Sequence, residues 1–311
     1  MLSEIAATIK EQFGNLGAPL HKVARQAQSL IAETTAPSDR AGSVATTRVG
    51  QLPTGPRPEA AEIRAAQLPA DGKVDHARAT RDAERTLASI DFSKPDIVLW
   101  VPATGSHSIP SSWQDNVAKT FGDRASLALV DYPANANFNS SVATGQETLK
   151  LVLAGIAERD GNHRVSLAGH SQGAWVIGDT IDDPTVGRIV DKAILYGHPA
   201  PARVDWSRGL DPRVQQVDDP ADPFTWEVVG GRQALDAIAE LHEGGSTTGE
   251  PLDIGGMISR GLKVASAALL NPGLGAYLIG KHVVADQDRS GNDPHHYAAR
   301  YGDGAAFLAR A

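Results

Sequence analysis

A five-residue motif, Gly169-His170-Ser171-Gln172-Gly173, stands in the middle of residues 164–177, which read RVSLAGHSQGAWVI. The apolar run before the motif predicts a buried strand, and residues 174–177 after it predict the opening of a helix. A strand that turns into a helix this sharply strains the backbone of the central serine, and small residues on either side relieve the crowding. The turn exposes the hydroxyl beside a helix N-terminus, where developing negative charge is stabilised. Ser171 is therefore the candidate nucleophile.

From residue 95 onward, short apolar runs alternate with helical segments. The expected strands are 97–101, 127–130, 165–168, 193–196 and 214–217, and the clearest helix is 141–159, with Ser140 or Ser141 as its N-cap. Strand–helix alternation predicts right-handed crossovers, and therefore a mostly parallel sheet with helices on both faces. The expected fold class is α/β, as a three-layer sandwich.

Composition narrows the function further. The chain has 311 residues, a formal charge of -8 and no cysteine. The negative charge argues against a nucleic-acid partner, and the missing thiols exclude disulfides, zinc thiolate sites and a cysteine nucleophile. We expect no cofactor. We also expect no transmembrane anchor, because no apolar run reaches the roughly 18 residues of a membrane span. The first residues lack the features of a Sec signal, which predicts a cytoplasmic protein until lysis or a dedicated secretion route releases it.

Two regions are expected along the chain, an N-terminal extension over 1–94 and a main domain over 95–311. Apolar residues at helical spacing predict one or two amphipathic helices within 2–33, whose apolar face either packs on the main domain or binds another chain. Residues 37–72 show no periodicity and are expected to be a Pro/Gly/Ala-rich linker or a wrapping arm. A short polar helix is expected over 74–90.

A serine nucleophile requires a histidine base and normally an acid that orients the histidine, and after a turn of this kind they follow in the order acid, then histidine. The strand at 214–217 ends in Asp218-Asp219-Pro220-Ala221-Asp222-Pro223. These carboxylates follow the C-terminal end of a strand, where ligands bind in open α/β sheets. Asp222 is the preferred acid, with Asp219 and then Asp218 as alternatives.

The candidate base lies in the loop before the last expected helix, 304–309. That loop contains His295 and His296, of which His295 is preferred and His296 is the alternative. The other late histidines, His242 and His282, lie in or next to helical stretches, where a packed or exposed structural histidine is the better interpretation. The expected triad is therefore Ser171, Asp222 and His295.

An oxyanion hole needs two aimed N–H donors, one from the residue after the nucleophile and one from the loop after an early strand. Gln172 fits the first role. Thr104, in the small-residue loop that follows the strand at 97–101, fits the second.

One further pattern concerns calcium. Residues 286–291 match the opening of a calcium loop, yet its twelfth position is Tyr297 instead of the bidentate glutamate of an EF-hand. An EF-hand is excluded, and a looser calcium site using Asp286 and Asp288 remains as the alternative to a solvated polar loop.

Taken together, these residues resemble the cutinase-like serine esterases of the α/β-hydrolase superfamily, and within them the phage lysin B enzymes, which are mycolylarabinogalactan esterases. The resemblance covers 95–311. It rests on the Thr104-Gly105 loop, the Gly-His-Ser-Gln-Gly-Ala turn, the Ala221-Asp222-Pro223 turn and the late histidine before a tyrosine. Cutinase relatives usually have Tyr where His170 stands.

The lysin B branch fits better than the secreted cutinases, which carry disulfides and a signal. Lysin B-like proteins lack both and have a helical insertion between acid and base, which corresponds here to about 231–285. The resemblance implies a serine esterase acting on lipid or mycolate esters, with mycolyl-arabinogalactan as the specific case. The alternatives are a lipase or phospholipase effector delivered by a specialised secretion system, and a non-catalytic binding protein on a hydrolase scaffold.

Overall fold

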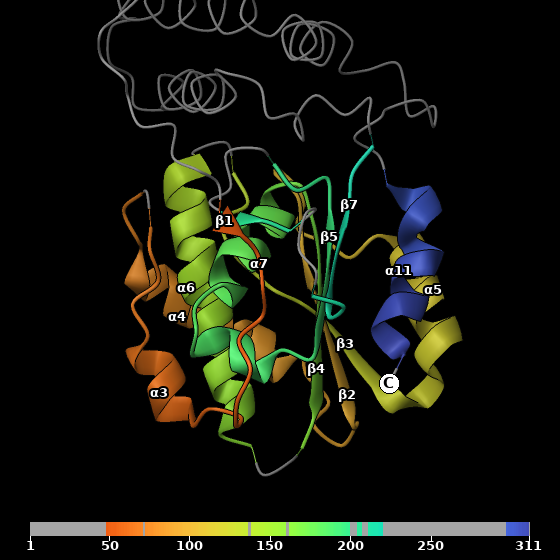
Figure 1. The fold of residues 1–311 in the computed structure, drawn as a ribbon, viewed down its shortest axis with the longest axis horizontal. Helices are drawn as coiled ribbons and strands as arrows, with labels where there is room; N and C mark the ends of the chain where they lie inside the picture. The colour runs from red at the N-terminus through yellow and green to blue at the C-terminus, as the bar shows by residue number, and fades with distance from the viewer. Residues whose placement is uncertain are drawn as a thin grey trace, which may run out of the picture.

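A five-stranded parallel sheet forms the centre of the molecule (Figure 1). The computed structural model describes residues 48–70, 72–135, 138–159, 162–199, 204–206, 211–219 and 297–310. The strands are β2 Asp96–Val101, β3 Ala125–Leu129, β4 Arg164–His170, β5 Lys192–Tyr196 and β7 Val214–Val217. Their order is β3-β2-β4-β5-β7, and every neighbouring pair is parallel. The predicted α/β class with a mostly parallel sheet is confirmed, and the strand before Ser171 lies at the centre of the sheet.

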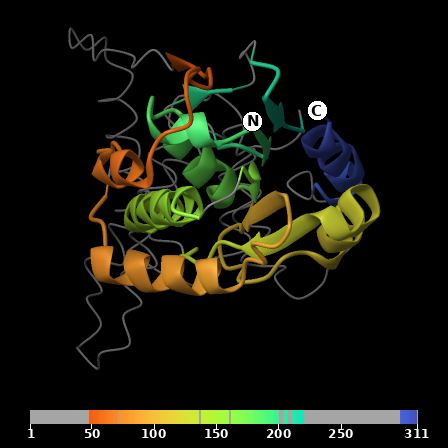
Figure 2. The same cartoon turned by 90° about the horizontal axis from the view of Figure 1, so that it is seen from below.

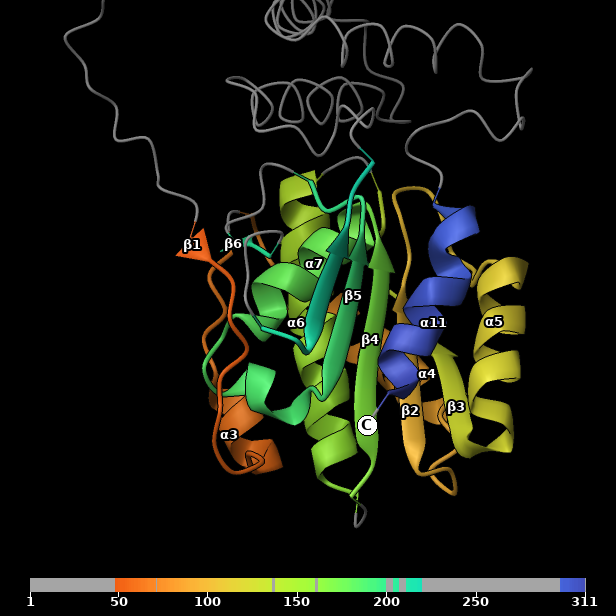
Figure 3. The ribbon, with the colours of Figure 1, turned by 45° about the vertical axis from the view of Figure 1, so that its right-hand side comes forward.

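Helices cover both faces of this sheet, which gives three layers (Figures 1 and 3). One face carries α3 Ala60–Ala65, α4 His76–Ala88, α6 Phe138–Ala157 and α7 Gln172–Ile181, and the other carries α5 Ser111–Phe121 and α11 Tyr301–Ala309. Short 3-10 turns lie at η1 Gly122–Arg124, η2 Val186–Ile189 and η3 Ala298–Arg300. None of the described helices combines the length and the hydrophobicity that a membrane crossing requires.

Alternating residues of the strands supply two different cores. In β2, Ile97 and Leu99 belong to a largely aliphatic core under α6 and α7, which we call the elbow-side core. Val98 and Trp100 belong to a core rich in tryptophan and tyrosine under α5 and α11, which we call the aromatic core. All six residues of β2 are buried, as expected for an inner strand of a parallel sheet that is covered on both faces.

The N-terminal arm, residues 48–70, wraps onto the main domain and is not a free linker. Its strand β1 Arg48–Val49 pairs in parallel with β6 Val204–Asp205. Leu52 is fully buried; its N–H donates to Asp211 Oδ2 (2.9 Å), and its carbonyl accepts from Arg213 Nη2 (2.7 Å). Of the two alternatives for 37–72, the described part therefore corresponds to the wrapping arm.

The helices at either side of residue 94 also join one core. The helix expected at 74–90 is α4, which packs along α6, as α3 does (Figure 2). No break in packing marks the 94/95 boundary within the described residues. The helices expected in 2–33 and the insertion expected at about 231–285 lie outside the described residues.

Two features of the helices differ from the sequence prediction. The helix expected from 141 begins at Phe138, because Ser141 is buried and bonds across to another element instead of capping its own helix. Helices α3 and α5 were not predicted. In α5, Trp113, Val117 and Phe121 form a short buried stripe at helical spacing behind Pro110.

Candidate active site

Ser171 occupies the single-residue turn between β4 and α7. Its backbone has φ 54° and ψ −119°, a positive φ that a non-glycine residue rarely adopts. Two hydrogen bonds hold it there: its N–H donates to the carbonyl of Tyr196 (2.8 Å), and its carbonyl accepts from the N–H of Trp175 (3.1 Å). The serine is half-buried, and it stands at the N-terminus of a ten-residue helix, whose dipole favours negative charge nearby.

The two flanking glycines are required by close backbone approach. A Cβ on Gly169 would lie 2.7 Å from Ile177 Cδ1 and 2.8 Å from the carbonyl carbon of Gly173. A Cβ on Gly173 would overlap the carbonyl oxygen of Val101, the last residue of β2. The first turn of α7 therefore lies directly on the end of β2, and only glycine at both positions allows this turn.

Gln172 is the first residue of α7, so its N–H has no acceptor within the helix. Its side chain is buried and both ends of the amide are bonded. Nε2 donates to the carbonyl of Asn135 (2.9 Å), and Oε1 accepts from Ser141 Oγ (3.0 Å). The side chain thus fixes the position of the N–H that the sequence analysis assigned to the oxyanion hole.

Thr104 lies in the loop that follows β2, and its side chain is exposed. The loop leaves the sheet at Pro102, whose carbonyl lies beside Gly173, so it starts next to the first turn of α7. Gly105 has φ 73°, and its N–H donates to the carbonyl of Ala134 (2.6 Å). The neighbouring residues Ala134 and Asn135 therefore bind the loop that carries Thr104 and the side chain of Gln172, respectively.

The acidic turn after β7 is described only in part. Asp218 is exposed and its Oδ2 accepts from Gln216 Nε2 (2.5 Å). Asp219 is half-buried, and its N–H donates to the hydroxyl oxygen of Tyr297 (3.0 Å). The preferred acid, Asp222, lies outside the described residues.

Both candidate bases, His295 and His296, also lie outside the described residues, and the next residue, Tyr297, is described. Its ring is buried and stands edge-on against His170, with the ring centroids 5.6 Å apart. It also packs at 6.0 Å from Tyr196. Tyr297 therefore joins three distant parts of the chain: the end of β4, the end of β5 and, through Asp219, the acidic turn.

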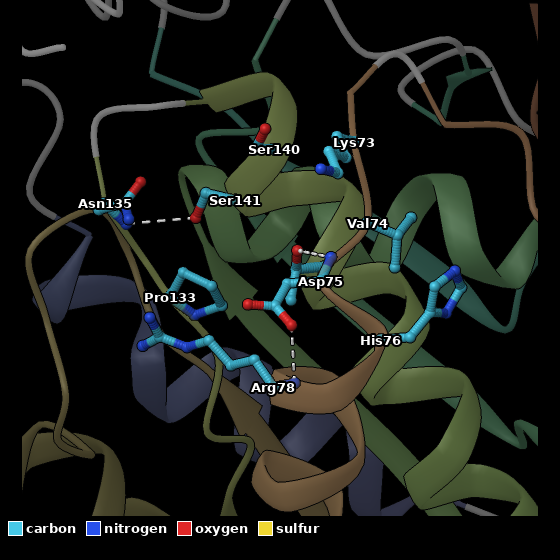
Figure 4. A pocket seen from close by; sticks show the side chains of 10 residues that line it. Lys73, Val74, Asp75, His76, Arg78, Pro133, Asn135, Ser140 and Ser141 are labelled. Carbon is cyan, nitrogen blue, oxygen red and sulfur yellow. Dashed lines mark hydrogen bonds between the residues drawn. The ribbon is translucent and has the colours of Figure 1, made fainter.

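A polar pocket of about 530 Å³ opens beside the N-termini of α4 and α6 (Figure 4). Lys73, Asp75 and His76 line one side, and Asn135 and Ser141 line the other. No pattern in the sequence predicted this pocket. It shares Asn135 and Ser141 with the hydrogen bonds that hold Gln172.

The candidate calcium ligands, Asp286 and Asp288, lie outside the described residues. Among the residues that the structure describes, no three His, Asp or Glu side chains are grouped to hold a metal ion. The calcium site therefore stays a prediction.

No protein-family model and no curated protein sequence matches the chain. Several solved structures are similar to it in backbone. Lysin B from Mycobacteriophage D29 is 17% identical, with a TM-score of 0.48 over 70% of this chain and 100% of that one. The catalytic core domain of acetyl xylan esterase from Trichoderma reesei is 15% identical, with a TM-score of 0.35 over 48% of this chain and 94% of that one.

A cutinase-like protein from Cryptococcus sp. is 17% identical, with a TM-score of 0.30 over 36% of this chain and 57% of that one, so this chain spans little more than half of its length. Both groups that the sequence resembles, cutinase-like proteins and lysin B, are thus among its structural neighbours. The assignment of an α/β-hydrolase fold rests on the chain's own parallel sheet and on the strand–serine–helix turn at its centre.

Proposed function

We propose that the protein is a serine hydrolase of carboxylic esters with Ser171 as its nucleophile. The observation that carries this proposal is the positive φ of Ser171 at the junction of β4 and α7. Backbone strain of this kind persists only where the surroundings impose it, and it is concentrated at functional sites. A structural turn at this position would place glycine there, because glycine adopts a positive φ without strain.

The proposed reaction has two steps. Ser171 Oγ attacks the ester carbonyl carbon while His295 accepts its proton, and the same histidine then protonates the departing alcohol oxygen, which leaves an acyl-enzyme. Water hydrolyses the acyl-enzyme by the same route and releases the acid. Asp222 orients the imidazole, and the N–H groups of Gln172 and Thr104 bind the oxyanion.

The contacts of Tyr297 support a base and an acid from these two segments of the chain. It directly follows His295 and His296 in sequence, its hydroxyl bonds to the acidic turn at Asp219, and its ring lies against His170, the neighbour of the nucleophile. Both candidate bases therefore directly precede a residue that packs against the neighbour of Ser171.

For the substrate we propose a lipid ester, with a mycolyl ester of arabinogalactan as the specific case. The support is the resemblance of residues 95–311 to lysin B, above all the Gly-His-Ser-Gln-Gly-Ala turn. Hydrolysis rates of p-nitrophenyl esters from two to sixteen carbons test it. We expect the rate to rise toward long chains, and a maximum at acetate would contradict the lipid assignment.

The nucleophile is tested by Ser171→Ala. We expect kcat for p-nitrophenyl butyrate to fall by more than about 10⁴-fold and labelling by a fluorophosphonate probe to disappear, since the oxyanion hole and binding alone provide only residual catalysis. Ser140→Ala, at a half-buried position that lines the polar pocket, is the control and should keep both. A wild-type protein that neither reacts with the probe nor hydrolyses esters would refute the proposal.

The base and the acid are assigned by paired variants. We expect His295→Ala and Asp222→Asn to lower kcat by at least about 10³-fold, because loss of a triad member costs this much or more. His296→Ala and Asp219→Asn should change it less than about tenfold. The reverse order within either pair would move the role to the neighbouring residue.

A further inference from the structure

The segment between β3 and α6 contacts both elements that carry the oxyanion donors, the loop with Thr104 and the first turn of α7. On the Thr104 side, the hydroxyl of Tyr132 donates to the carbonyl of Pro102 (2.7 Å), and the carbonyl of Ala134 accepts from the N–H of Gly105 (2.6 Å). These two bonds hold the start of the loop and the residue directly after Thr104.

On the Gln172 side, three groups form a closed ring of hydrogen bonds. The N–H of Asn135 donates to Ser141 Oγ (3.2 Å; Figure 4), and Ser141 Oγ donates to Gln172 Oε1 (3.0 Å). Gln172 Nε2 closes the ring by donating to the carbonyl of Asn135 (2.9 Å). Each member orients the next, so the amide of Gln172 has one favourable orientation.

The segment is built to resist displacement. Tyr132 and Ala134 are fully buried, and Ser141 is nearly so. The ring of Tyr132 packs so closely on α6 that a Cβ at Gly145 would lie 2.7 Å from its Cδ2. Ala134 has φ 46°, which is uncommon for a residue with a side chain, so the surroundings maintain a backbone that alanine alone would not adopt.

We propose that Tyr132–Asn135 together with Ser141 form a brace that sets the separation between the N–H groups of Gln172 and Thr104. The proposal rests on the esterase function proposed above. Oxyanion donors stabilise the transition state only if they are aimed in advance at the oxygen that becomes negative, and a displacement of about 1 Å costs as much as 10²-fold in rate. The brace residues are positioning residues: they act on the reaction through the two donors and affect transition-state binding more than substrate binding.

The experiment is Ser141→Ala, which removes the hydroxyl at the centre of the ring. We expect kcat for p-nitrophenyl butyrate to fall about tenfold with KM within about twofold, and fluorophosphonate labelling to slow by a similar factor. Ser141→Thr restores the hydroxyl, and we expect it to recover kcat to within about threefold. Ser140→Ala is the matched control, because this neighbouring serine lines the same pocket and belongs to no bond of the brace.

A second variant tests the brace from the other donor. Tyr132→Phe removes the bond to Pro102 and keeps the packed ring, so we expect a fall in kcat of about threefold to tenfold with KM unchanged. If Ser141→Ala fails to fold, Tyr132→Phe decides by the same criterion. Unchanged kcat in a folded Ser141→Ala or Tyr132→Phe protein, or a rise in KM alone, would overturn the brace. Failure of the esterase proposal looks different, because the wild-type protein would then show no hydrolysis and no labelling.

Discussion

The two faces of the sheet are packed in different ways. On the elbow side, small residues let backbones come together: Gly173 lies on the end of β2, and a Cβ at Gly145 of α6 would lie 2.9 Å from Val176 of α7. On the other face, large rings fill the space between the helices and the sheet. Trp100, Trp113 and Tyr301 form a cluster with ring centroids 5.2–5.6 Å apart.

The two kinds of packing serve positioning and stability to different degrees. Backbones in close contact can be arranged in few ways, so this packing fixes the nucleophile and the brace to within the tolerance that catalysis requires. Ring packing buries much apolar surface for each residue and tolerates more variation in angle. The elbow side therefore fixes the positions of the nucleophile and the brace. The aromatic core contributes stability, holds α5 and α11, and includes Tyr297, which packs against His170.

Trp113→Ala should produce the largest effect on stability. It removes a fully buried indole from the aromatic core, so we expect the free energy of unfolding to fall by about 3–5 kcal/mol, measured by urea titration. We expect the labelling rate of the protein that remains folded to change by less than about threefold, because the glycines and the brace that position Ser171 lie on the opposite face of the sheet from Trp113. A labelling rate that falls together with the free energy of unfolding would contradict this division of tasks between the two faces.

We expect the second-largest effect from alkaline pH, which should lower the stability of the aromatic core. Burial raises the pKa of the Tyr301 hydroxyl to about 12, above its unfolded value of about 10. The unfolded state therefore loses its proton first, and the stability that this group contributes is complete below pH 10 and is lost as the pH rises to 12, up to about 3 kcal/mol. Melting temperatures from pH 8 to 12 test this.

Tyr301→Phe is the matched variant for the pH series. It keeps the ring and removes the titrating hydroxyl, so its melting temperature should fall less steeply above pH 10 than that of the wild-type protein. Equal slopes for the two proteins would contradict the assignment to Tyr301.

The smallest expected effect concerns strain on the elbow side. The described non-glycine residues with positive φ, Ala134 and Ser171, both belong to that side. We expect Ser171→Gly to be about 1 kcal/mol more stable than Ser171→Ala, since glycine adopts this backbone without a Cβ penalty. Urea titrations of both variants measure the difference, and equal stability would show that the positive φ carries no strain.

Much of the sheet could be predicted from the sequence, because inner parallel strands are continuous apolar runs. The strand expected at 97–101 is observed at Asp96–Val101, and that expected at 193–196 is observed at Lys192–Tyr196. The turn at Ser171 could be predicted for a different reason: part of its steric requirement is local, because a Cβ on Gly169 would meet Gly173 and Ile177.

The remaining features depend on contacts between distant residues. Alanine does not by itself indicate a positive φ, so the backbone of Ala134 could not be predicted. Ser140 or Ser141 is the N-cap expected from the sequence, and the real partner of Ser141, Gln172, lies 31 positions away. The aromatic core joins rings from four separate segments. The prolines around Leu52 predict either a linker or a wrapping arm. The sequence does not decide between them, because the partners of Leu52 lie far away, in the segment 211–213. The assignments of Asp222 and His295 stay predictions.

The clamp on Leu52 has a consequence for synthesis of the chain. Its partner Asp211 is made 159 residues later, which at ribosomal speeds is a delay of roughly 10–30 s. Leu52 is thus among the first described residues to be translated, and its clamp closes only after β5 has been made. An incomplete chain that lacks Asp211 and Arg213 cannot close the clamp, so a closed clamp shows that the chain has been made up to the start of β7.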